Sequence, residues 1–234
     1  MRDNGWNMKK YDIALFDLDG TLSESGEGIL DCVRMVFMET QRPLPSEDVI
    51  RSFIGPPMYD SLIGCGFEHE DALKAVEIYK RNYIESGIYK NKLYDGIIDV
   101  LQSLKAEGVK LGVASSKYQK FTDRIINMLG IGEFFDRVGG STSVSGKPMD
   151  GCKPRLSKLD VINYVIEDLR TGDDDRIVMI GDTGFDAKGA SNAGIGFIGC
   201  LFGYGTREDM EKHYTIGTPT FAEKPRDIIP MIIR

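Results

Sequence analysis

The feature that most constrains this chain is a short apolar segment that stops abruptly at an acidic turn. Residues 11–16 read Tyr-Asp-Ile-Ala-Leu-Phe and run directly into Asp17-Leu-Asp-Gly-Thr21. The pattern returns later, where residues 176–180 lead into Gly181-Asp-Thr-Gly-Phe-Asp186. Short apolar runs bounded by turn signals are typical of buried parallel strands. We therefore expect a parallel sheet with acidic residues at the carboxyl ends of its strands.

Helical and strand patterns alternate along the chain after residue 93. The predicted helices cover residues 96–106, about 121–129, 158–169 and 227–233, and the predicted strands cover residues 109–114, 176–180 and 195–201. This alternation predicts an α/β fold with a doubly wound, Rossmann-like parallel sheet. In such a sheet, ligands bind beyond the carboxyl ends of the strands.

Residues 23–92 show helical spacing and no strand pattern. Apolar residues recur there at intervals of three and four, and Ile54-Gly-Pro-Pro57 interrupts the helical pattern. We therefore predict an α/β core of residues 1–22 and 93–234 with an inserted helical cap of residues 23–92.

The composition narrows the partners and the location of the protein. The 234 residues carry a formal net charge of −7, with a pI near 5.0. An acidic surface is poorly suited to nucleic acid or to an anionic membrane. No apolar run approaches the roughly 18 residues that span a bilayer, and the first residues lack the apolar stretch of a signal peptide. We expect a cytoplasmic protein with neither partner, and its oligomeric state stays open.

Polar side chains follow three of the predicted strands. Asp17 and Asp19 follow the first, Ser115 and Ser116 follow the second, and Asp182 and Asp186 follow the third. The carboxyl ends of parallel strands share one edge of the sheet, so these side chains are expected to converge. Four clustered carboxylates raise one another's pKa values unless a cation is present. An oxygen-only set of Asp17, Asp19, Asp182 and Asp186 favours Mg²⁺, especially beside a phosphate oxygen.

Simpler interpretations do not account for these acidic segments. Asp-Gly is a common turn pair, but a turn alone does not explain the second acidic strand end. A calcium loop requires Gly at its sixth position and Glu at its twelfth, which fall on Leu22 and Gly28. Scattered cysteines and only two histidines offer little for a zinc site or a histidine-dependent triad. Catalysis is therefore expected to depend on carboxylates.

Taken together, Asp17-Leu-Asp-Gly-Thr21, Ser115, a downstream lysine and the segment 181–186 resemble the haloacid dehalogenase-like (HAD) superfamily. The resemblance extends from about residue 11 to the end of the chain, and the helical insert resembles a type-one cap. Ile54-Gly-Pro-Pro57 and Gly203-Tyr-Gly205 are similar to segments of the phosphoglycolate phosphatase-like branch.

The resemblance implies a Mg²⁺-dependent phosphatase that hydrolyses small phosphate monoesters through an aspartyl-phosphate. Asp17 would be the nucleophile, and Asp19 would protonate the leaving oxygen and later activate water. Asp182 would hold the metal with the main-chain carbonyl of Asp19, and Asp186 would bind the metal or its water shell. A carboxylate can approach an anionic phosphate only if a metal and a lysine screen the repulsion.

The resemblance also implies a phosphate site. Ser115 would donate its hydroxyl, aided by backbone N–H groups near Ser116 at the start of the following helix, with Gly20 as a further phosphate-binding residue. Three lysines could complete the site, because the usual Lys-Pro-x-Pro signature is absent: Lys147, Lys153 and Lys158. The spacing to Asp182 favours Lys158, and Lys153 is the alternative. Relatives often carry Asp at the position of Glu24, so the role of Glu24 stays open.

Two other functions fit the motifs less well. A phosphomutase would return the phosphoryl group to its substrate, but mutase-like relatives often carry a larger apolar residue at the position of Thr21. A phospho-accepting switch resembling a receiver domain would not need a cap of about 70 residues.

The cap is predicted to choose the substrate, because the core residues address only the phosphoryl group, the metal and the leaving oxygen. Met58 and Tyr59 follow the two stiffening prolines, in a segment predicted to be a non-helical loop, and can offer an apolar wall with a hydroxyl. Glycolate phosphate, nucleotides and sugar phosphates all stay open as substrates.

Overall fold

The structure, a computed structural model, describes residues 9–142 and 154–233. Its main sheet has six strands in the order β5-β4-β1-β6-β7-β8, and every neighbouring pair is parallel. The strands are β1 (Ile13–Phe16), β4 (Lys110–Tyr118), β5 (Arg137–Ser141), β6 (Ile177–Gly181), β7 (Gly196–Cys200) and β8 (Thr220–Ala222). The predicted α/β fold with a doubly wound parallel sheet is confirmed.

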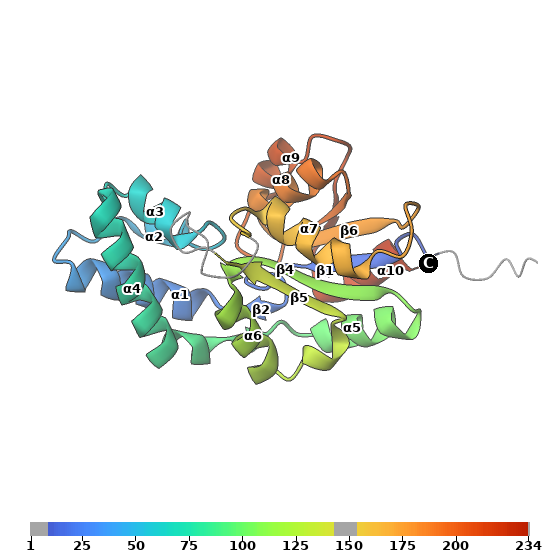
Figure 1. The fold of residues 1–234 in the computed structure, drawn as a ribbon, viewed down its shortest axis with the longest axis horizontal. Helices are drawn as coiled ribbons and strands as arrows, with labels where there is room; N and C mark the ends of the chain where they lie inside the picture. Colours follow the sequence, from blue (N-terminus) through green and yellow to red (C-terminus); the bar gives the residue numbers. More distant parts are fainter. Residues whose placement is uncertain (1–8, 143–153, 234) are drawn as a thin grey trace, which may run out of the picture.

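Helices cover both faces of this sheet (Figure 1). One face carries α7 (Lys158–Leu169), α8 (Gly184–Ala193) and α9 (Arg207–His213), and the other carries α5 (Ile97–Ala106), α6 (Gln119–Met128) and α10 (Ile229–Ile232). Successive side chains of β1 point to opposite faces of the sheet. Ile13 and Leu15 pack on the face that α7 covers, whereas Ala14 and Phe16 pack on the face that α5 covers. A strand that is buried on both faces has no polar side, which is why β1 is a continuous apolar run.

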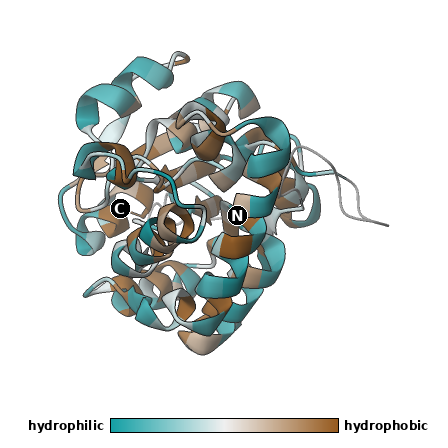
Figure 2. Cartoon of the chain, turned by 90° about the vertical axis from the view of Figure 1, so that its left-hand side faces the viewer, coloured by the Kyte–Doolittle hydropathy of each residue, from teal (hydrophilic) through white to brown (hydrophobic). Residues whose placement is uncertain are grey.

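The remaining helices form the cap at one end of the sheet, on the left in Figure 1. They are α1 (Gly26–Glu39), α2 (Glu47–Arg51), α3 (Met58–Gly64) and α4 (His69–Glu85), followed by a 3₁₀ turn, Gly87–Lys90. Hydrophilic and hydrophobic segments alternate along these helices (Figure 2), as amphipathic helices require.

The expectation that residues 23–92 contain no strand is wrong at both ends. β2 (Ser23–Glu24) and β3 (Lys92–Leu93) pair antiparallel where the chain enters and leaves the cap. The side chains of Ser23 and Asn91 also hydrogen-bond at 3.2 Å. The two connections therefore form one short ribbon, which fixes the base of the cap to the core.

Within the described part of the α/β core, the strands β5 and β8 and the helix α9 are not predicted from the sequence. The sequence of β5 is Arg-Val-Gly-Gly-Ser, and its two glycines weaken the strand pattern. Packing requires them, because a Cβ on Gly139 would lie 2.5 Å from Val165 and one on Gly140 would lie 2.8 Å from the backbone of Gln119. The predicted closing helix of residues 227–233 is divided into a 3₁₀ turn, Pro225–Ile228, and α10.

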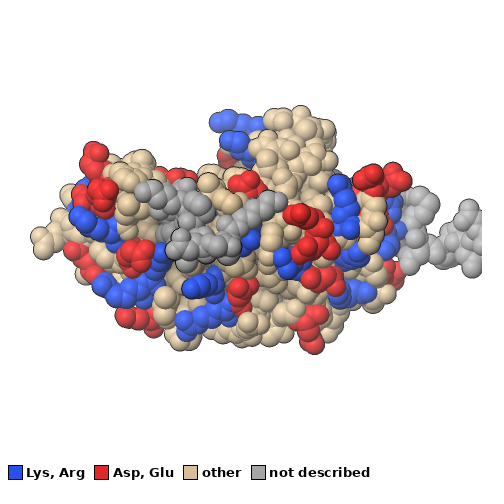
Figure 3. Space-filling model, in the orientation of Figure 1, with Lys and Arg blue, Asp and Glu red and all other residues tan. Residues whose placement is uncertain are grey.

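The surface carries both signs of charge. On the face shown in Figure 3, Lys and Arg side chains intermingle with Asp and Glu. None of the helices in the described ranges is long and apolar enough to cross a bilayer.

Candidate active site

Three carboxylates meet beyond the carboxyl ends of β1 and β6. Phe16 pairs in register with Ile180, so Asp17 and Asp182, which follow these strands, lie side by side. Asp186 joins them from the first turn of α8. Oxygen atoms of the three side chains lie within 4.8 Å of one another, and all three residues are buried.

The electrostatics of this cluster call for a cation. Burial raises the pKa of the Asp17 carboxyl to about 6; Lys158 opposes the rise, and Asp186 and Asp19 add to it. Burial, followed by the charges of Asp186 and Asp17, raises the pKa of Asp182 well above its usual range. Three closely packed oxygen donors without nitrogen or sulfur fit a hard divalent ion such as Mg²⁺.

Lys158 reaches the cluster from the first residue of α7. A capping box of Ser157 and Asp160 fixes the start of this helix. The Lys158 Nζ lies 2.8 Å from Asp17 Oδ1 and 2.6 Å from Asp186 Oδ1, and donates to the Ala114 carbonyl at 3.0 Å. Although burial opposes its charge, Asp17 and Asp186 raise the lysine's pKa. The other two lysine candidates, Lys147 and Lys153, lie outside the described residues.

Asp19 does not join the carboxylate cluster through its side chain. Its Oδ2 pairs with Lys117 Nζ at 2.9 Å, and both side chains are buried. The other oxygen, Oδ1, is buried and has no hydrogen-bond partner within the described ranges. Lys117 Nζ also lies 4.5 Å from the ring centroid of Tyr83, which belongs to the cap. No local pattern predicts a role for Lys117, because a lysine after a strand is ordinarily solvated and only the cap buries this one.

Ser115 and Ser116 face the same edge of the sheet through an irregularity in β4. The register between β4 and β5 shifts between Ala114 and Tyr118, so the intervening residues bulge out of regular pairing. Ser115 is 2% exposed, and its Oγ accepts a hydrogen bond from the Lys117 N–H at 3.3 Å. The expectation that Ser116 lies at the start of a helix is wrong, because α6 begins at Gln119.

Gly20 plays a different part from the expected one. Its N–H already donates to the Ser23 carbonyl at 2.8 Å, so the structure does not support a phosphate-binding amide at this position. Its φ is +84°, and a Cβ would lie 2.1 Å from Asp182 Oδ2. A glycine is needed here for the left-handed turn and for the close approach of Asp182.

A cavity of about 100 Å³ lies between these core residues and the cap. Cap residues that line it include Ile29, Phe53, Pro56, Pro57, Met58, Val76, Tyr79 and Lys80, opposite Asp17, Asp19, Ser115, Ser116, Lys117, Tyr118 and Phe121 of the core. A mostly apolar wall thus faces a strongly polar floor.

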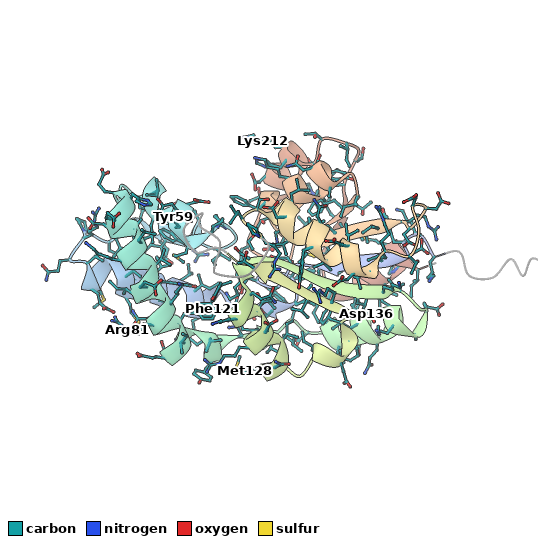
Figure 4. All side chains as sticks on the ribbon, in the orientation of Figure 1. Tyr59, Arg81, Phe121, Met128, Asp136 and Lys212 are labelled. Atoms are coloured by element: carbon teal, nitrogen blue, oxygen red, sulfur yellow. The ribbon has the colours of Figure 1, made fainter. Side chains whose placement is uncertain are left out.

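The two predicted cap residues differ in their relation to this cavity. Both lie in the first turn of α3, not in a loop, because the helix begins directly after Pro57. Met58 lines the cavity, whereas the Tyr59 hydroxyl lies 2.7 Å from His69 Nδ1 within the cap. Figure 4 labels Tyr59 on α3 in the cap and Phe121 on α6 in the core. Glu24 pairs with Lys92 at 2.8 Å across the β2–β3 ribbon.

Comparison with known proteins identifies the family to which the chain belongs. The model of the haloacid dehalogenase-like hydrolase family matches residues 14–200. The chain therefore belongs to that family. A crystal structure of a predicted phosphatase from Clostridium acetobutylicum superposes with a TM-score of 0.83 at 32% identity, covering 94% of this chain and 97% of that one.

Relatives of known sequence carry several different names. The chain is 34% identical over 203 residues to the tyrosine-protein kinase PtkA of Mycobacterium tuberculosis, covering 87% of this chain but only 66% of that relative. A 5'-nucleotidase of Pseudomonas aeruginosa is 31% identical over 205 residues, covering 87% of this chain and 89% of the relative. A phosphoglycolate phosphatase of Aquifex aeolicus is 27% identical over 219 residues, covering 92% and 96%. The predicted resemblance to the phosphoglycolate phosphatase-like branch is confirmed.

Proposed function

We propose that this protein is a Mg²⁺-dependent phosphatase that hydrolyses small phosphate monoesters through an aspartyl-phosphate. The observation that carries the proposal is the contact of Lys158 with Asp17 and Asp186 inside a buried cluster of three carboxylates. A fixed cation beside a carboxylate nucleophile is what attack on an anionic phosphate requires.

The residues divide the reaction between them. An Asp17 carboxylate oxygen attacks phosphorus, and the bond from phosphorus to the ester oxygen breaks. Asp19 Oδ1, which has no hydrogen-bond partner among the described residues, gives a proton to the leaving oxygen and then takes one from the water that attacks the aspartyl-phosphate. Inorganic phosphate leaves, and the Asp17 carboxylate is restored.

Other groups hold the phosphoryl group and the metal. Lys158 balances negative charge on Asp17 and the phosphoryl group, and Ser115 donates its hydroxyl to a phosphoryl oxygen. Asp17, Asp182 and Asp186 would hold Mg²⁺, which when bound supplies positive charge beside the transferred group.

The cavity supports a small organic part on the substrate. Ligand sites for drug-sized molecules usually enclose about 300–1,000 Å³, whereas this one encloses about 100 Å³. Of the names carried by the relatives, phosphoglycolate phosphatase therefore suits the closed cavity better than 5'-nucleotidase.

A panel of phosphorylated metabolites assayed for phosphate release tests the function. We expect turnover of at least one two- or three-carbon phosphate ester in Mg²⁺, lower turnover of nucleoside monophosphates, and loss of both in excess EDTA that added Mg²⁺ reverses. Mg²⁺ should also raise the melting temperature, since a ligand that binds only the folded state stabilises it. Metal-independent turnover, or no turnover of any ester, would contradict the proposal.

A second prediction separates the two cap residues. Met58→Ala removes apolar contact from the cavity wall and is expected to lower kcat/KM for the preferred metabolite by about five- to tenfold, as the loss of roughly one buried methylene or more implies. Tyr59→Ala is the matched control, because its hydroxyl contacts His69 and Tyr59 does not line the cavity. The measurement is kcat/KM on the metabolite and on a small aryl phosphate. Equal losses for both variants on both substrates would place the specificity determinant elsewhere in the cap.

A further inference from the structure

Tyr204, in the loop after β7, joins the core to the first helix of the cap. Its hydroxyl oxygen accepts hydrogen bonds from the Ser25 N–H at 2.8 Å and the Gly26 N–H at 2.7 Å. These are the N-cap residue and the first residue of α1. The first N–H groups of a helix have no partner within the helix, and Ser25 does not cap α1 with its own side chain. A core residue therefore supplies the hydrogen-bond acceptor at the start of a cap helix.

The same residue contacts the carboxylate cluster through its backbone. The Tyr204 N–H donates to Asp182 Oδ2 at 2.8 Å. Glycines on both sides permit this approach: a Cβ on Gly203 would lie 2.3 Å from Asp182 Cβ, and one on Gly205 would lie 2.1 Å from the Asp182 carbonyl oxygen. Positions 203 and 205 therefore lie too close to Asp182 for any residue larger than glycine.

The ring of Tyr204 is held equally closely at its other end. A Cβ on Gly26 would lie 2.9 Å from Tyr204 Cε1, so the start of α1 rests on the tyrosine ring. Ser25 directly follows β2, one strand of the ribbon through which the cap joins the core. Any rotation of the cap about this ribbon must move Ser25 and Gly26 relative to Tyr204.

We propose that Tyr204 is a positioning residue that holds the cap in register with Asp182 and thereby keeps the cavity at its observed size. The inference rests on the proposed function for its kinetic consequences, whereas its structural consequence does not depend on any activity. The two hydrogen bonds to the Tyr204 hydroxyl favour one position of the cap on the core. The hydrogen bond from the Tyr204 N–H to Asp182 fixes that position relative to the carboxylate cluster.

Tyr204→Phe tests the proposal with little disturbance, because it keeps the ring and the N–H bond to Asp182. It removes the acceptor at α1 together with the hydrogen bond between the side chains of Tyr204 and Tyr94. Gly26→Ala is a second variant that acts from the cap side by displacing the start of α1 from the ring. Tyr214→Phe is the matched control, since it removes a tyrosine hydroxyl bond, to the Ile195 carbonyl at 3.0 Å, in the core.

The first readout is amide hydrogen exchange at residues 25–30, which needs no substrate. We expect exchange at least about tenfold faster in Tyr204→Phe and Gly26→Ala than in the wild type and in Tyr214→Phe. The second readout is kinetic: KM for the preferred metabolite should rise about tenfold in both variants, with kcat on a small aryl phosphate close to that of the wild type. The double variant should be no worse than either single one, because both break the same contact.

The outcomes distinguish this inference from the proposed function. Unchanged exchange at residues 25–30 in a folded Tyr204→Phe protein would overturn the inference whether or not the enzyme is active. An equal fall of kcat on every substrate with KM unchanged would also overturn it, since Tyr204 would then act on the chemistry and not on the cap. Faster exchange in a protein that hydrolyses no phosphate ester would support the inference and reject the proposed function alone.

Discussion

Asp17→Asn is expected to lower phosphate release by at least about 10⁴-fold, because an amide oxygen cannot replace the carboxylate that attacks phosphorus. The fold should survive. Lys158 keeps its contacts with Asp186 and with the Ala114 carbonyl, and the asparagine oxygen can still accept from the Lys158 Nζ. The substitution also removes one of three carboxylates that repel one another in the metal-free protein.

Phosphate release with the best metabolite and a thermal melt, both with and without Mg²⁺, measure these effects. Asp173→Asn is the matched control, since it makes the same chemical change on an exposed turn. Wild-type turnover in folded Asp17→Asn protein would rule out the aspartyl-phosphate mechanism. A collapse of the melting temperature would instead mean that Asp17 matters to the fold more than its contacts indicate.

Lys158→Ala is expected to lower kcat by about 10³-fold, because the charge it removes acts mostly on the transition state. It also leaves Asp17 and Asp186 buried without their cation. Removing one partner of a buried ion pair typically costs about 3–5 kcal/mol of stability. The metal-free variant should therefore melt at a lower temperature than the wild type, and Mg²⁺ should recover part of the difference, since it supplies a positive charge to the same carboxylates.

Three further variants test whether the charge of Lys158, and not the size of its side chain or the loss of any nearby lysine, accounts for the fall in kcat. Lys158→Met keeps most of the length of the side chain and should lose as much kcat as the alanine variant. Lys188→Ala removes an exposed lysine from α8 and should have little effect on kcat. Lys153→Ala should likewise do little; if it reproduced the loss and Lys158→Ala did not, the role of phosphate-binding lysine would pass to Lys153.

Much of the fold could be predicted because the signals are local. A short run of apolar residues such as Ile13–Phe16, bounded by turn signals, is typical of a buried parallel strand, and Asp17 is then expected at the carboxyl end of that strand. The strand order places Asp182 beside Asp17 because β1 and β6 are neighbours. The helical insert was equally visible, since its apolar residues repeat at helical intervals.

Local sequence patterns failed to predict structure at glycines that are required for close packing, because glycine itself favours no particular secondary structure. Gly139 and Gly140 weaken the strand signal of β5, yet only glycine fits against Val165 and Gln119 there. Gly20 presents the same difficulty. The family resemblance implied a phosphate-binding residue at this position, whereas the Gly20 N–H donates to the Ser23 carbonyl and the absence of a side chain lets Asp182 approach.

The sequence by itself determined which chemistry is possible: carboxylates at the ends of parallel strands, a lysine at a suitable spacing, and a cap that must contact the rest of the substrate. The tertiary structure alone decided how the remaining polar groups are used. Lys117 pairs with Asp19 and is covered by the ring of Tyr83 from the cap. Tyr204 contacts both Asp182 and the start of α1, because Gly203 and Gly205 let its loop lie close to Asp182. Burial and pairing depend on residues from distant segments that meet only in the folded chain, so no local pattern could have revealed these contacts.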